Sequence, residues 1–394
     1  MVKGLEVSIS LIIALYPALA VYNLLPGTTL ASSLLWLALI PLFVCKIKEI
    51  VYNRDEIFFF FWILLISVLS ALIHLFYGTE WYDFTLFYHN LYSIILCLVP
   101  LFFITNEINI DVFVKTVFFF GVVASVVLIW QWLSLFFFGE FQKDLFIPGL
   151  EINRGLDTFS AFRPSAFFTE PAHFAIYMLP AFQIAVLYKK YILAGLFAFA
   201  ILCSGSSTGF LLLFVLLMIH LYKLGSRKWY TFIVPLLLVL AAIWVVNVAF
   251  PEVFLRNFDK LGSASQGKSD LRLLGPLAYL SEFHFYEHLL GLTLNQLGNF
   301  LLMNGISTFG YANYANAIIY MYISFGFVGF ILFGGYVLKK WKNISTTYGF
   351  LVIFLGVACS DQILFNGHYL YLLTFVLLTD KISNCQNANE NVKK

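Results

Sequence analysis

The feature that most constrains this chain is a series of long apolar runs separated by short polar breaks. Most runs are about 17 to 25 residues long, the length that a helix needs to cross roughly 30 Å of hydrocarbon. Only 11% of the 394 residues are charged, against roughly 25% in an ordinary soluble domain. The sequence therefore predicts an all-α, polytopic membrane protein of about 12 transmembrane helices, built as one integral membrane domain over residues 1–394. The spans are expected at about residues 7–24, 29–45, 57–77, 84–105, 113–137, 172–188, 191–204, 208–222, 229–250, 313–337, 346–363 and 367–380.

The distribution of basic residues predicts the topology. Lys-rich breaks and both termini fall on the same side of these spans, which the positive-inside rule assigns to the cytoplasm. Only seven of the 23 Lys and Arg residues lie on the other side, all of them in two large loops at about 138–171 and 251–312. The short runs 191–204 and 208–222 could instead form one broken or re-entrant hairpin. Any chemistry outside the membrane is expected in the two large loops.

Four of the six arginines lie in these loops: Arg154 and Arg163 in the first, Arg256 and Arg272 in the second. Arg is the side chain best suited to two-pronged capture of phosphate, because its planar fork carries several donors and stays charged. Two arginine-bearing loops at a membrane surface favour a lipid-linked phosphate or pyrophosphate as ligand. The alternative is that each arginine pairs with an acidic residue of its loop or with a lipid headgroup.

The first loop ends at Glu170, Pro171 and His173, where it enters a span. Pro171 suits the first turn of a helix, which puts Glu170 at the N-cap, where the helix dipole favours an anion. Glu170 is therefore either a helix cap or an acid/base group close to Arg163. His173 falls in the first helical turn, where a structural role is expected.

The second loop contains a spacing of 3 and 4 that predicts one face of an amphipathic helix on the membrane surface. This face carries Arg272, Gly275, Tyr279, Glu282 and Tyr286. Pro276 fits poorly inside such a helix, so Arg272 could instead precede its start.

A metal site is an alternative for the acidic and histidine residues that follow. Glu282, His284, Glu287 and His288 lie close together in the sequence, but they lack the HExxH spacing and no Cys joins them. We expect neither a metal nor a cofactor. The chain has no Walker A sequence and almost no charged residues at the span centres, which argues against a nucleotide-driven or ion-coupled transporter.

Several short motifs follow one another in a fixed order. They are Arg163 to Glu170-Pro171, Ser204-Gly205-Ser206-Ser207-Thr208-Gly209, Ser269-Asp270-Leu271-Arg272, Gly291, and Asn316 to Gly326-Phe327-Val328-Gly329. Together with the dozen spans and the large late loop, this order resembles the O-antigen polymerase and ligase superfamily of bacterial inner membranes, over residues of about 110–340.

The resemblance implies an inverting, metal-independent glycosyltransferase that uses undecaprenyl-pyrophosphate-linked sugars on the periplasmic face. Arg163 and Arg272 match the loop arginines of the family, which would hold the pyrophosphate of the donor. Ligases of this superfamily usually carry a His-Asn dipeptide where this chain has Ala315-Asn316. The departure favours a polymerase over a ligase.

We therefore expect a bacterial polysaccharide polymerase, for O-antigen or capsule, in the inner membrane with both termini cytoplasmic. Its catalytic residues are predicted to be Arg163, Arg272, Glu170 and Glu282, with Glu170 or Glu282 as a general base. Its substrate-binding residues are predicted to be Arg154, Arg256, Tyr279, Tyr286, His288 and Asn316. The expected partners are the lipid-linked oligosaccharide, membrane lipid and a chain-length regulator protein, and not nucleic acid. The alternatives are an O-antigen ligase and an oligosaccharide-lipid flippase or transporter.

Overall fold

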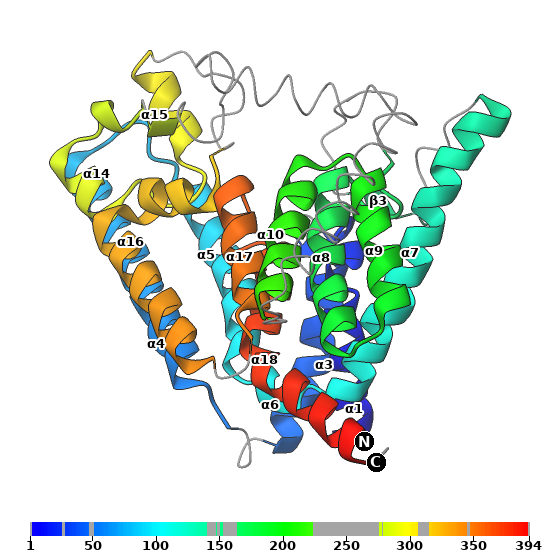
Figure 1. The fold of residues 1–394 in the computed structure, drawn as a ribbon. Coiled ribbons are helices and arrows are strands. Elements are labelled where there is room, and N and C mark those ends of the chain that lie inside the picture. Colours follow the sequence, from blue (N-terminus) through cyan, green and yellow to red (C-terminus); the bar gives the residue numbers. More distant parts are fainter. Residues whose placement is uncertain are drawn as a thin grey trace.

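Helices dominate the computed structural model, and both chain termini lie at the same end of the bundle (Figure 1). The structure describes residues 2–25, 28–46, 51–139, 147, 150–152, 164–223, 276–277, 279–305, 315–344 and 347–392. The longer helices are α1 (Val2–Ala14), α3 (Leu30–Lys46), α4 (Arg54–Tyr77), α5 (Phe84–Leu98), α7 (Ile110–Phe138), α8 (Pro171–Leu187), α9 (Tyr191–Cys203), α10 (Ser207–Lys223), α16 (Ala317–Asn343), α17 (Gly349–Ser360) and α18 (Gly367–Val392). The shorter helices are α2 (Tyr16–Leu19), α6 (Ile104–Glu107), α14 (Phe285–Leu290) and α15 (Leu297–Met303), with 3-10 turns η1 (Val99–Phe102) and η2 (Tyr279–Glu282).

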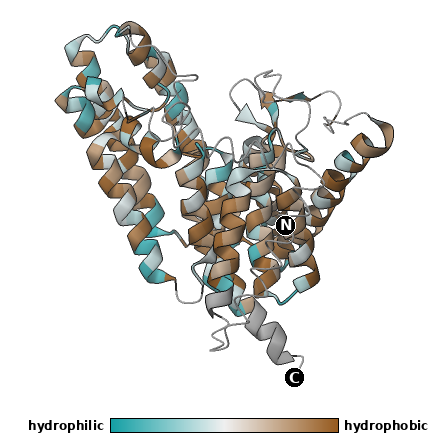
Figure 2. Ribbon diagram, turned by 45° about the horizontal axis from the view of Figure 1, so that its top comes forward, coloured by the Kyte–Doolittle hydropathy of each residue, from teal (hydrophilic) through white to brown (hydrophobic). Residues whose placement is uncertain are grey.

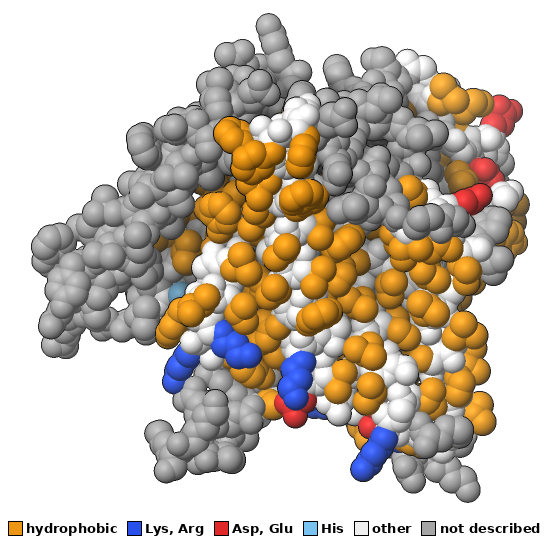
Figure 3. All heavy atoms as spheres, turned by 90° about the vertical axis from the view of Figure 1, so that its right-hand side faces the viewer, with side chains coloured by type: hydrophobic (Ala, Val, Ile, Leu, Met, Phe, Trp, Pro, Cys, Tyr) orange, Lys and Arg blue, Asp and Glu red, His pale blue; other side chains and the backbone are white. Residues whose placement is uncertain are grey.

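The helices have the apolar character that a membrane requires. Four stretches among the described residues are long and apolar enough to cross a bilayer: Arg54–Tyr77, Phe84–Phe102, Ile110–Phe138 and Ala317–Asn343. Five shorter apolar helices accompany them, and hydrophobic residues cover most of the bundle (Figure 2). On the face in Figure 3, a broad hydrophobic band lies above Lys and Arg side chains that gather toward the end with the termini. The prediction of a helical membrane protein is confirmed to the extent that the described helices are apolar and four stretches are long enough to cross a bilayer.

The bundle opens away from the end that carries the termini. Helices α4 and α16 pack along each other on one side, with α14 and α15 beyond their far end (Figure 1). Helix α7 forms the opposite edge, and α8 lies in the interior, with every residue of Phe174–Ala185 buried. The predicted span 229–250 lies outside the described residues. Each of the other predicted runs contains a helix, as expected.

The first predicted run, 7–24, is not one helix. Helix α1 ends at Ala14, because Pro17 lacks an N–H and its ring would clash with the carbonyl four residues earlier. Residues Tyr22–Leu25 then form strand β1, which lies between β2 (Thr28–Thr29) and β3 (Glu151–Ile152) in a small antiparallel sheet. The fold class is all-α as predicted, and this small sheet is a local feature at the end of the bundle opposite the termini.

The two short predicted runs 191–204 and 208–222 form two separate helices. Helix α9 ends at Cys203 and α10 starts at Ser207, and the turn between them contains Gly205 with φ of +65°. The backbone N–H of Gly209 donates to the Ser206 hydroxyl at 3.2 Å, which caps the start of α10. Two helices joined by a tight turn fit both two separate spans and the alternative of a re-entrant hairpin, and both helices pack against α8.

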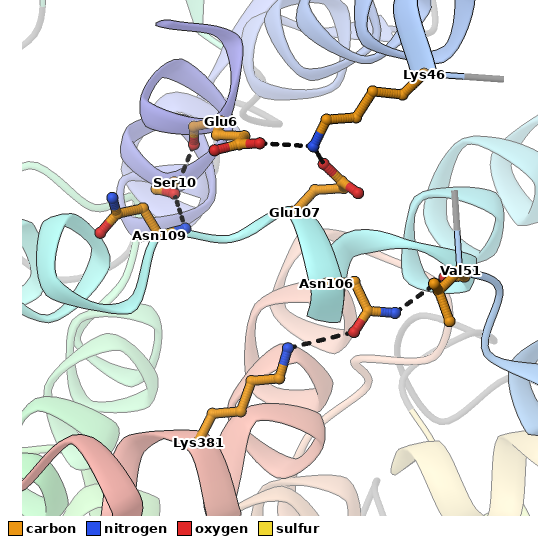
Figure 4. A network of polar contacts seen from close by, with 8 residues as sticks. All are labelled: Glu6, Ser10, Lys46, Val51, Asn106, Glu107, Asn109 and Lys381. Carbon is orange, nitrogen blue, oxygen red and sulfur yellow. Dashed lines mark hydrogen bonds and ion pairs between the residues drawn. The ribbon is translucent and has the colours of Figure 1, made fainter. Parts of the chain in front are cut away.

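Charged side chains join helices at the end with the termini. The ammonium of Lys46 on α3 lies 2.6 Å from Glu6 on α1 and 2.7 Å from Glu107 on α6 (Figure 4). Lys381 on α18 donates to the backbone oxygen of Thr105 at 2.6 Å and to Asn106 at 3.3 Å. These contacts bring the start of α1 and the end of α18 onto the same connection between α5 and α7.

A second charged cluster joins α4 to α16. Lys340 Nζ lies 2.5 Å from Glu56 Oε1 and 3.6 Å from Asp55 Oδ2, and Tyr336 donates a hydrogen bond to Glu56. Lys339 adds a more exposed contact to Asp55 at 2.7 Å. Glu56 is only 3% exposed, so its charge depends on Lys340 for compensation.

Candidate active site

The four loop arginines lie outside the described residues. Their gathering around a phosphate therefore stays a prediction. The structure does describe residues 164–170, directly after Arg163, and most of 276–305, which follow Arg272 in the sequence. Both segments lie at the end of the bundle opposite the termini (Figure 1).

Residues 164–170 are fixed against α7 by buried contacts. Gln131 on α7 is fully buried, and its side-chain oxygen accepts a hydrogen bond from the backbone N–H of Ala166 at 2.9 Å. The Ser165 hydroxyl donates to the Phe168 carbonyl at 2.7 Å, and the Phe168 ring is buried. The chain after Arg163 thus enters α8 along a defined path.

Glu170 occupies the position that the sequence predicts. Helix α8 starts at Pro171, and Glu170 is its N-cap residue, with an extended backbone. Its side chain makes no capping hydrogen bond and is exposed. The carboxylate therefore lies beside a helix N-terminus, in reach of solvent, and is not engaged as a cap.

A cavity of about 300 Å³ lies directly beside this N-terminus. Its lining residues come from α2, β2, α3, α5, α8 and the start of α18, and from the connections next to them. They are Tyr16, Pro17, Ala20, Val21, Thr29, Ser32, Ser93, Leu96, Cys97, Thr169, His173, Phe365, Asn366, Gly367 and His368. The described lining contains hydroxyl, amide and imidazole groups but no Lys, Arg, Asp or Glu, so the cavity is polar without carrying a fixed charge.

Two histidines meet at this cavity. The ring centroids of His173 and His368 are 4.4 Å apart, with the rings inclined at 42°. Thr169 fixes the first ring, because its hydroxyl lies 2.7 Å from His173 Nδ1. His368 Nδ1 is buried and has no hydrogen-bond partner in the described part of the chain. The sequence predicts a structural role for His173 and does not single out His368.

The second loop does not form the single amphipathic helix that its spacing predicts. Tyr279 and Glu282 belong to η2, whereas Tyr286 belongs to α14, and His284 between them has an extended backbone. The break arises because Glu287 accepts a hydrogen bond from the His284 N–H at 2.7 Å, which starts a new helix. The three predicted residues therefore do not share one helical face.

Three of the predicted substrate-binding side chains of this loop make contacts within the protein. Tyr279 is buried, and Tyr286 stacks on Tyr77 of α4 with centroids 5.0 Å apart. His288 Nδ1 lies 3.0 Å from the hydroxyl of Tyr322 on α16. These side chains attach α14 to the ends of α4 and α16.

The two loops do not meet in the described part of the chain. Glu282 is exposed and accepts a hydrogen bond from the hydroxyl of the neighbouring Ser281 at 3.4 Å. No described contact joins it to Glu170, and Figure 1 shows α14 and α8 over different parts of the bundle. The two predicted catalytic carboxylates are therefore separate features.

Two glycines of the motif series lie where the backbone of α14 meets the backbone of α16. Gly326 interrupts α16 with φ of +61° and ψ of −165°, and Gly291 ends α14 with φ of +74° and ψ of 179°. A Cβ on Gly326 would lie 2.4 Å from the carbonyl carbon of Leu289, and one on Gly291 would lie 2.3 Å from that of Ser324. Only glycine fits at both positions.

The break in α16 provides hydrogen bonds for the chain that crosses it. The N–H of Leu292 donates to the Ile323 carbonyl at 2.9 Å, and the N–H of Thr293 donates to the Ser324 carbonyl at 2.8 Å. Because Gly326 leaves the helical conformation, these carbonyls are available to a neighbouring segment. The glycine pair thus fixes residues 291–293 onto α16.

Polar side chains from α5 and α16 hold the next residues. Tyr320 accepts a hydrogen bond from the Asn295 N–H at 2.6 Å, and Asn295 Nδ2 donates to Asn90 of α5 at 2.7 Å. Gln296 and the backbone of Asp83 exchange two hydrogen bonds of 2.6 and 3.1 Å. The far end of α4, α5 and α16 is therefore tied into one structural unit.

Asn316 is the N-cap of α16. Its side chain accepts a hydrogen bond from the Ile319 N–H at 2.9 Å, and only 2% of the residue is exposed. This is the alternative role that the sequence offered for it. Ala315, which stands where a ligase would carry His, is fully buried.

The acidic and histidine cluster of the second loop has no metal-binding arrangement in the described structure. Among all described residues, no group of three or more His, Cys, Asp and Glu side chains could hold an ion. Glu287 instead caps α14, and its second carboxylate oxygen is buried without a partner. Burial raises the pKa of the Glu287 carboxyl.

The cavity is the part of the site that sequence reasoning missed. Its polar side chains come from segments far apart in the sequence, and each resembles an ordinary cap or turn residue. The signal that could have drawn attention to His368 is the preceding Asn366-Gly367, a turn dipeptide between two apolar runs. This dipeptide lies at the start of α18, where the imidazole of His368 lies next to His173 of α8.

The chain matches no protein-family model and no curated protein.

Proposed function

We propose that this chain is a bacterial polysaccharide polymerase, for O-antigen or capsule. In this proposal it transfers the growing glycan from undecaprenyl pyrophosphate to a lipid-linked repeat unit on the periplasmic face. The observation that supports the proposal most directly is a polar, uncharged cavity beside Glu170 in a helical membrane protein. A small uncharged polar cavity at the mouth of such a bundle suits a sugar better than an ion or a nucleotide.

The motif order gives independent support. Gly291 and Gly326 are part of the resemblance to the O-antigen polymerase and ligase superfamily, and the close backbone contact between residues 289–291 and 324–326 explains why both motifs need glycine. The same contact fixes the second loop relative to the spans. Such rigidity suits an enzyme that must hold two large lipid-linked substrates in register.

The proposed chemistry needs little beyond positioning and charge stabilisation. Pyrophosphate is already a good leaving group, and arginines can stabilise the negative charge that develops on it without a metal. Arg163 and Arg272 are proposed to hold the pyrophosphate, with Arg154 and Arg256 as further contacts. The general base is proposed among the carboxylates of the loops or the polar groups near them.

The proposed orientation places both termini in the cytoplasm of a bacterial inner membrane. The ion pairs of Lys46 and Lys340 and the hydrogen bonds of Lys381 lie toward the end with the termini, in agreement with the positive-inside rule. In a cysteine-free background, Glu170→Cys should react with an impermeant thiol reagent in spheroplasts and Arg54→Cys should not. Labelling of Arg54→Cys alone would reverse the orientation and remove the proposed active face from the periplasm.

The arginine hypothesis has a direct test. Arg163→Ala and Arg272→Ala should each abolish long polysaccharide while the protein still accumulates in the membrane. Lys at either position should restore little of the polymer, because it cannot form a two-pronged contact with phosphate. Arg54→Ala is the matched control, since Arg54 is exposed at the start of α4 near the termini. Normal polymer length in both loop variants would contradict the proposed site.

A gene deletion separates the polymerase from the ligase. Without the polymerase, lipopolysaccharide core should carry at most one repeat unit, because another protein still performs ligation. If the deletion instead leaves bare cores while full-length polymer accumulates on undecaprenyl pyrophosphate, the ligase replaces the polymerase as the function. Buried Ala315 lacks the imidazole on which the ligase alternative depends.

A further inference from the structure

We infer that the cavity between α2, α3, α5, α8 and α18 is the binding site for the acceptor sugar, and that His173 takes the proton of its reacting hydroxyl. The inference rests on the proposed function and makes it more specific. It assigns a substrate and a general base to residues outside those predicted from the sequence.

The composition of the cavity indicates an uncharged, hydroxyl-rich ligand. Thr29, Ser32, Ser93 and Asn366 line it with groups that both donate and accept hydrogen bonds. The described lining has no cation that would pair with a phosphate. At about 300 Å³ it is near the lower limit of small-molecule sites, which suits a single sugar ring better than a whole repeat unit.

Apolar rings complete the site. Tyr16 and Phe365 line the same cavity and are 4% and 5% exposed. A sugar ring presents apolar C–H groups on its faces and hydroxyls on its edge, so it can pack on aromatic rings while its hydroxyls reach the polar side chains. A few polar groups set among apolar walls are typical of a specific ligand site.

His173 has the arrangement of an oriented base. Its Nδ1 lies 2.7 Å from the Thr169 hydroxyl, and Thr169 is itself 9% exposed, so this contact holds the ring in one orientation. With the proton on Nδ1 and donated to Thr169, the Nε2 lone pair is the acceptor. A base that is positioned by a third group follows the general logic of activated nucleophiles.

His368 lies directly beside this base. Its ring centroid is 4.4 Å from that of His173, and its buried Nδ1 has no hydrogen-bond partner among the described residues. His368 also offers a second imidazole that can hydrogen-bond the sugar.

The step balances without a metal or a redox partner. The acceptor hydroxyl oxygen forms a bond to the anomeric carbon of the donor glycan, while the bond from that carbon to the pyrophosphate oxygen breaks. The electron pair leaves with undecaprenyl pyrophosphate, and the hydroxyl proton passes to His173 Nε2. Attack from the face opposite the leaving group inverts the anomeric carbon.

The first experiment measures binding to the purified full-length chain in nanodiscs. The probe is the free repeat-unit oligosaccharide, prepared from the polysaccharide of the same strain, and binding is followed by calorimetry. Ser93→Phe should fill the cavity and weaken binding at least tenfold, because Ser93 lines the cavity and the added ring would occupy the space proposed for the sugar. Ser8→Phe is the matched control and should bind like the wild type, because Ser8 is exposed on α1 outside this cavity and its hydroxyl donates to the Gly4 carbonyl of its own helix at 3.0 Å.

The second experiment measures polymerisation of lipid-linked repeat units against pH. His173→Gln should lower the rate by about 10²- to 10⁴-fold, the usual contribution of a general base, and should remove the ascending limb of the pH profile. Tyr16, Cys97 and His368 are the other titratable side chains of the described lining, so His368→Gln is measured in parallel and should retain that limb. The exposed His89→Gln on α5 is the matched control.

The outcomes separate this inference from the proposed function. Polymerisation by His173→Gln at the wild-type rate and with the wild-type pH profile would overturn the base, and binding that ignores Ser93→Phe would overturn the cavity. If Ser93→Phe does not fold, Thr169→Val replaces it and should slow polymerisation about tenfold. A wild-type chain that binds the oligosaccharide in the cavity but never polymerises would contradict the polymerase and leave the sugar site standing.

Discussion

Replacing Gly326 by Ala should destabilise the far end of the bundle more than a methyl group added at any other position there. At φ of +61° and ψ of −165°, Gly326 is in a region that essentially only glycine occupies. An added Cβ would also lie 2.4 Å from the carbonyl carbon and the carbonyl oxygen of Leu289. Because both atoms are backbone, no side-chain rotation can relieve the contact.

The expected cost follows from two contributions. The backbone conformation costs a non-glycine residue about 1–3 kcal/mol. Separation of α14 from α16 would also remove the hydrogen bonds from Leu292 and Thr293 to α16, worth about 0.5–1.5 kcal/mol each. We therefore expect Gly326→Ala to lower the free energy of unfolding by about 2–6 kcal/mol.

Gly334→Ala on the same helix is the matched control. It has no heavy atom within 4 Å of an added Cβ, and Ala in a helix interior is favoured over Gly by about 0.5–1 kcal/mol. Denaturant unfolding of both purified variants in detergent, with limited proteolysis of residues 276–305, measures the difference. Equal stability of the two variants would refute the backbone contact between α14 and α16.

Two further predictions concern buried charges. Lys340→Met should destabilise the chain by about 3–5 kcal/mol in thermal unfolding, because it leaves Glu56 buried and unpaired; adding Glu56→Gln should restore most of the loss, and no rescue would contradict the ion pair. Burial raises the pKa of Glu287, so its stabilising contribution is complete at acidic pH and is lost as pH rises through that raised value. Glu287→Gln should therefore flatten the pH dependence of unfolding, which thermal unfolding at several pH values measures; an unchanged pH dependence would contradict this role of Glu287.

The spans could be predicted because a membrane imposes the same requirement on each of them. A run such as 113–137 must be long, apolar and helical, and α7 covers it as Ile110–Phe138. The prediction of one span over 7–24 was wrong because it followed the length and hydropathy of the run and gave too little weight to Pro17. Once the chain is near the membrane surface, a proline and a short β-pairing are tolerated, and hydropathy alone does not distinguish them from the end of a span.

Local rules also succeeded at two site positions. Pro171 after Glu170 marks the start of α8, and Asn316 caps α16, since both depend only on neighbouring residues. The helical face through Tyr279 and Tyr286 failed for the opposite reason. Its spacing fits a helix, but the chain is redirected where α14 meets the glycine break in α16, and that contact is tertiary.

The histidine pair shows why the cavity could not be predicted from the sequence. Periodicity indicates which face of a helix is polar, but it does not indicate which other helix that face meets. His173 alone in a first helical turn is most simply structural, and His368 alone after Asn366-Gly367 is a residue in another turn. Their ring centroids lie 4.4 Å apart because α8 packs against the start of α18. The pairing of the two imidazoles thus depends on helix packing, and substitutions that shift α8 against α18 should impair it without changing either histidine.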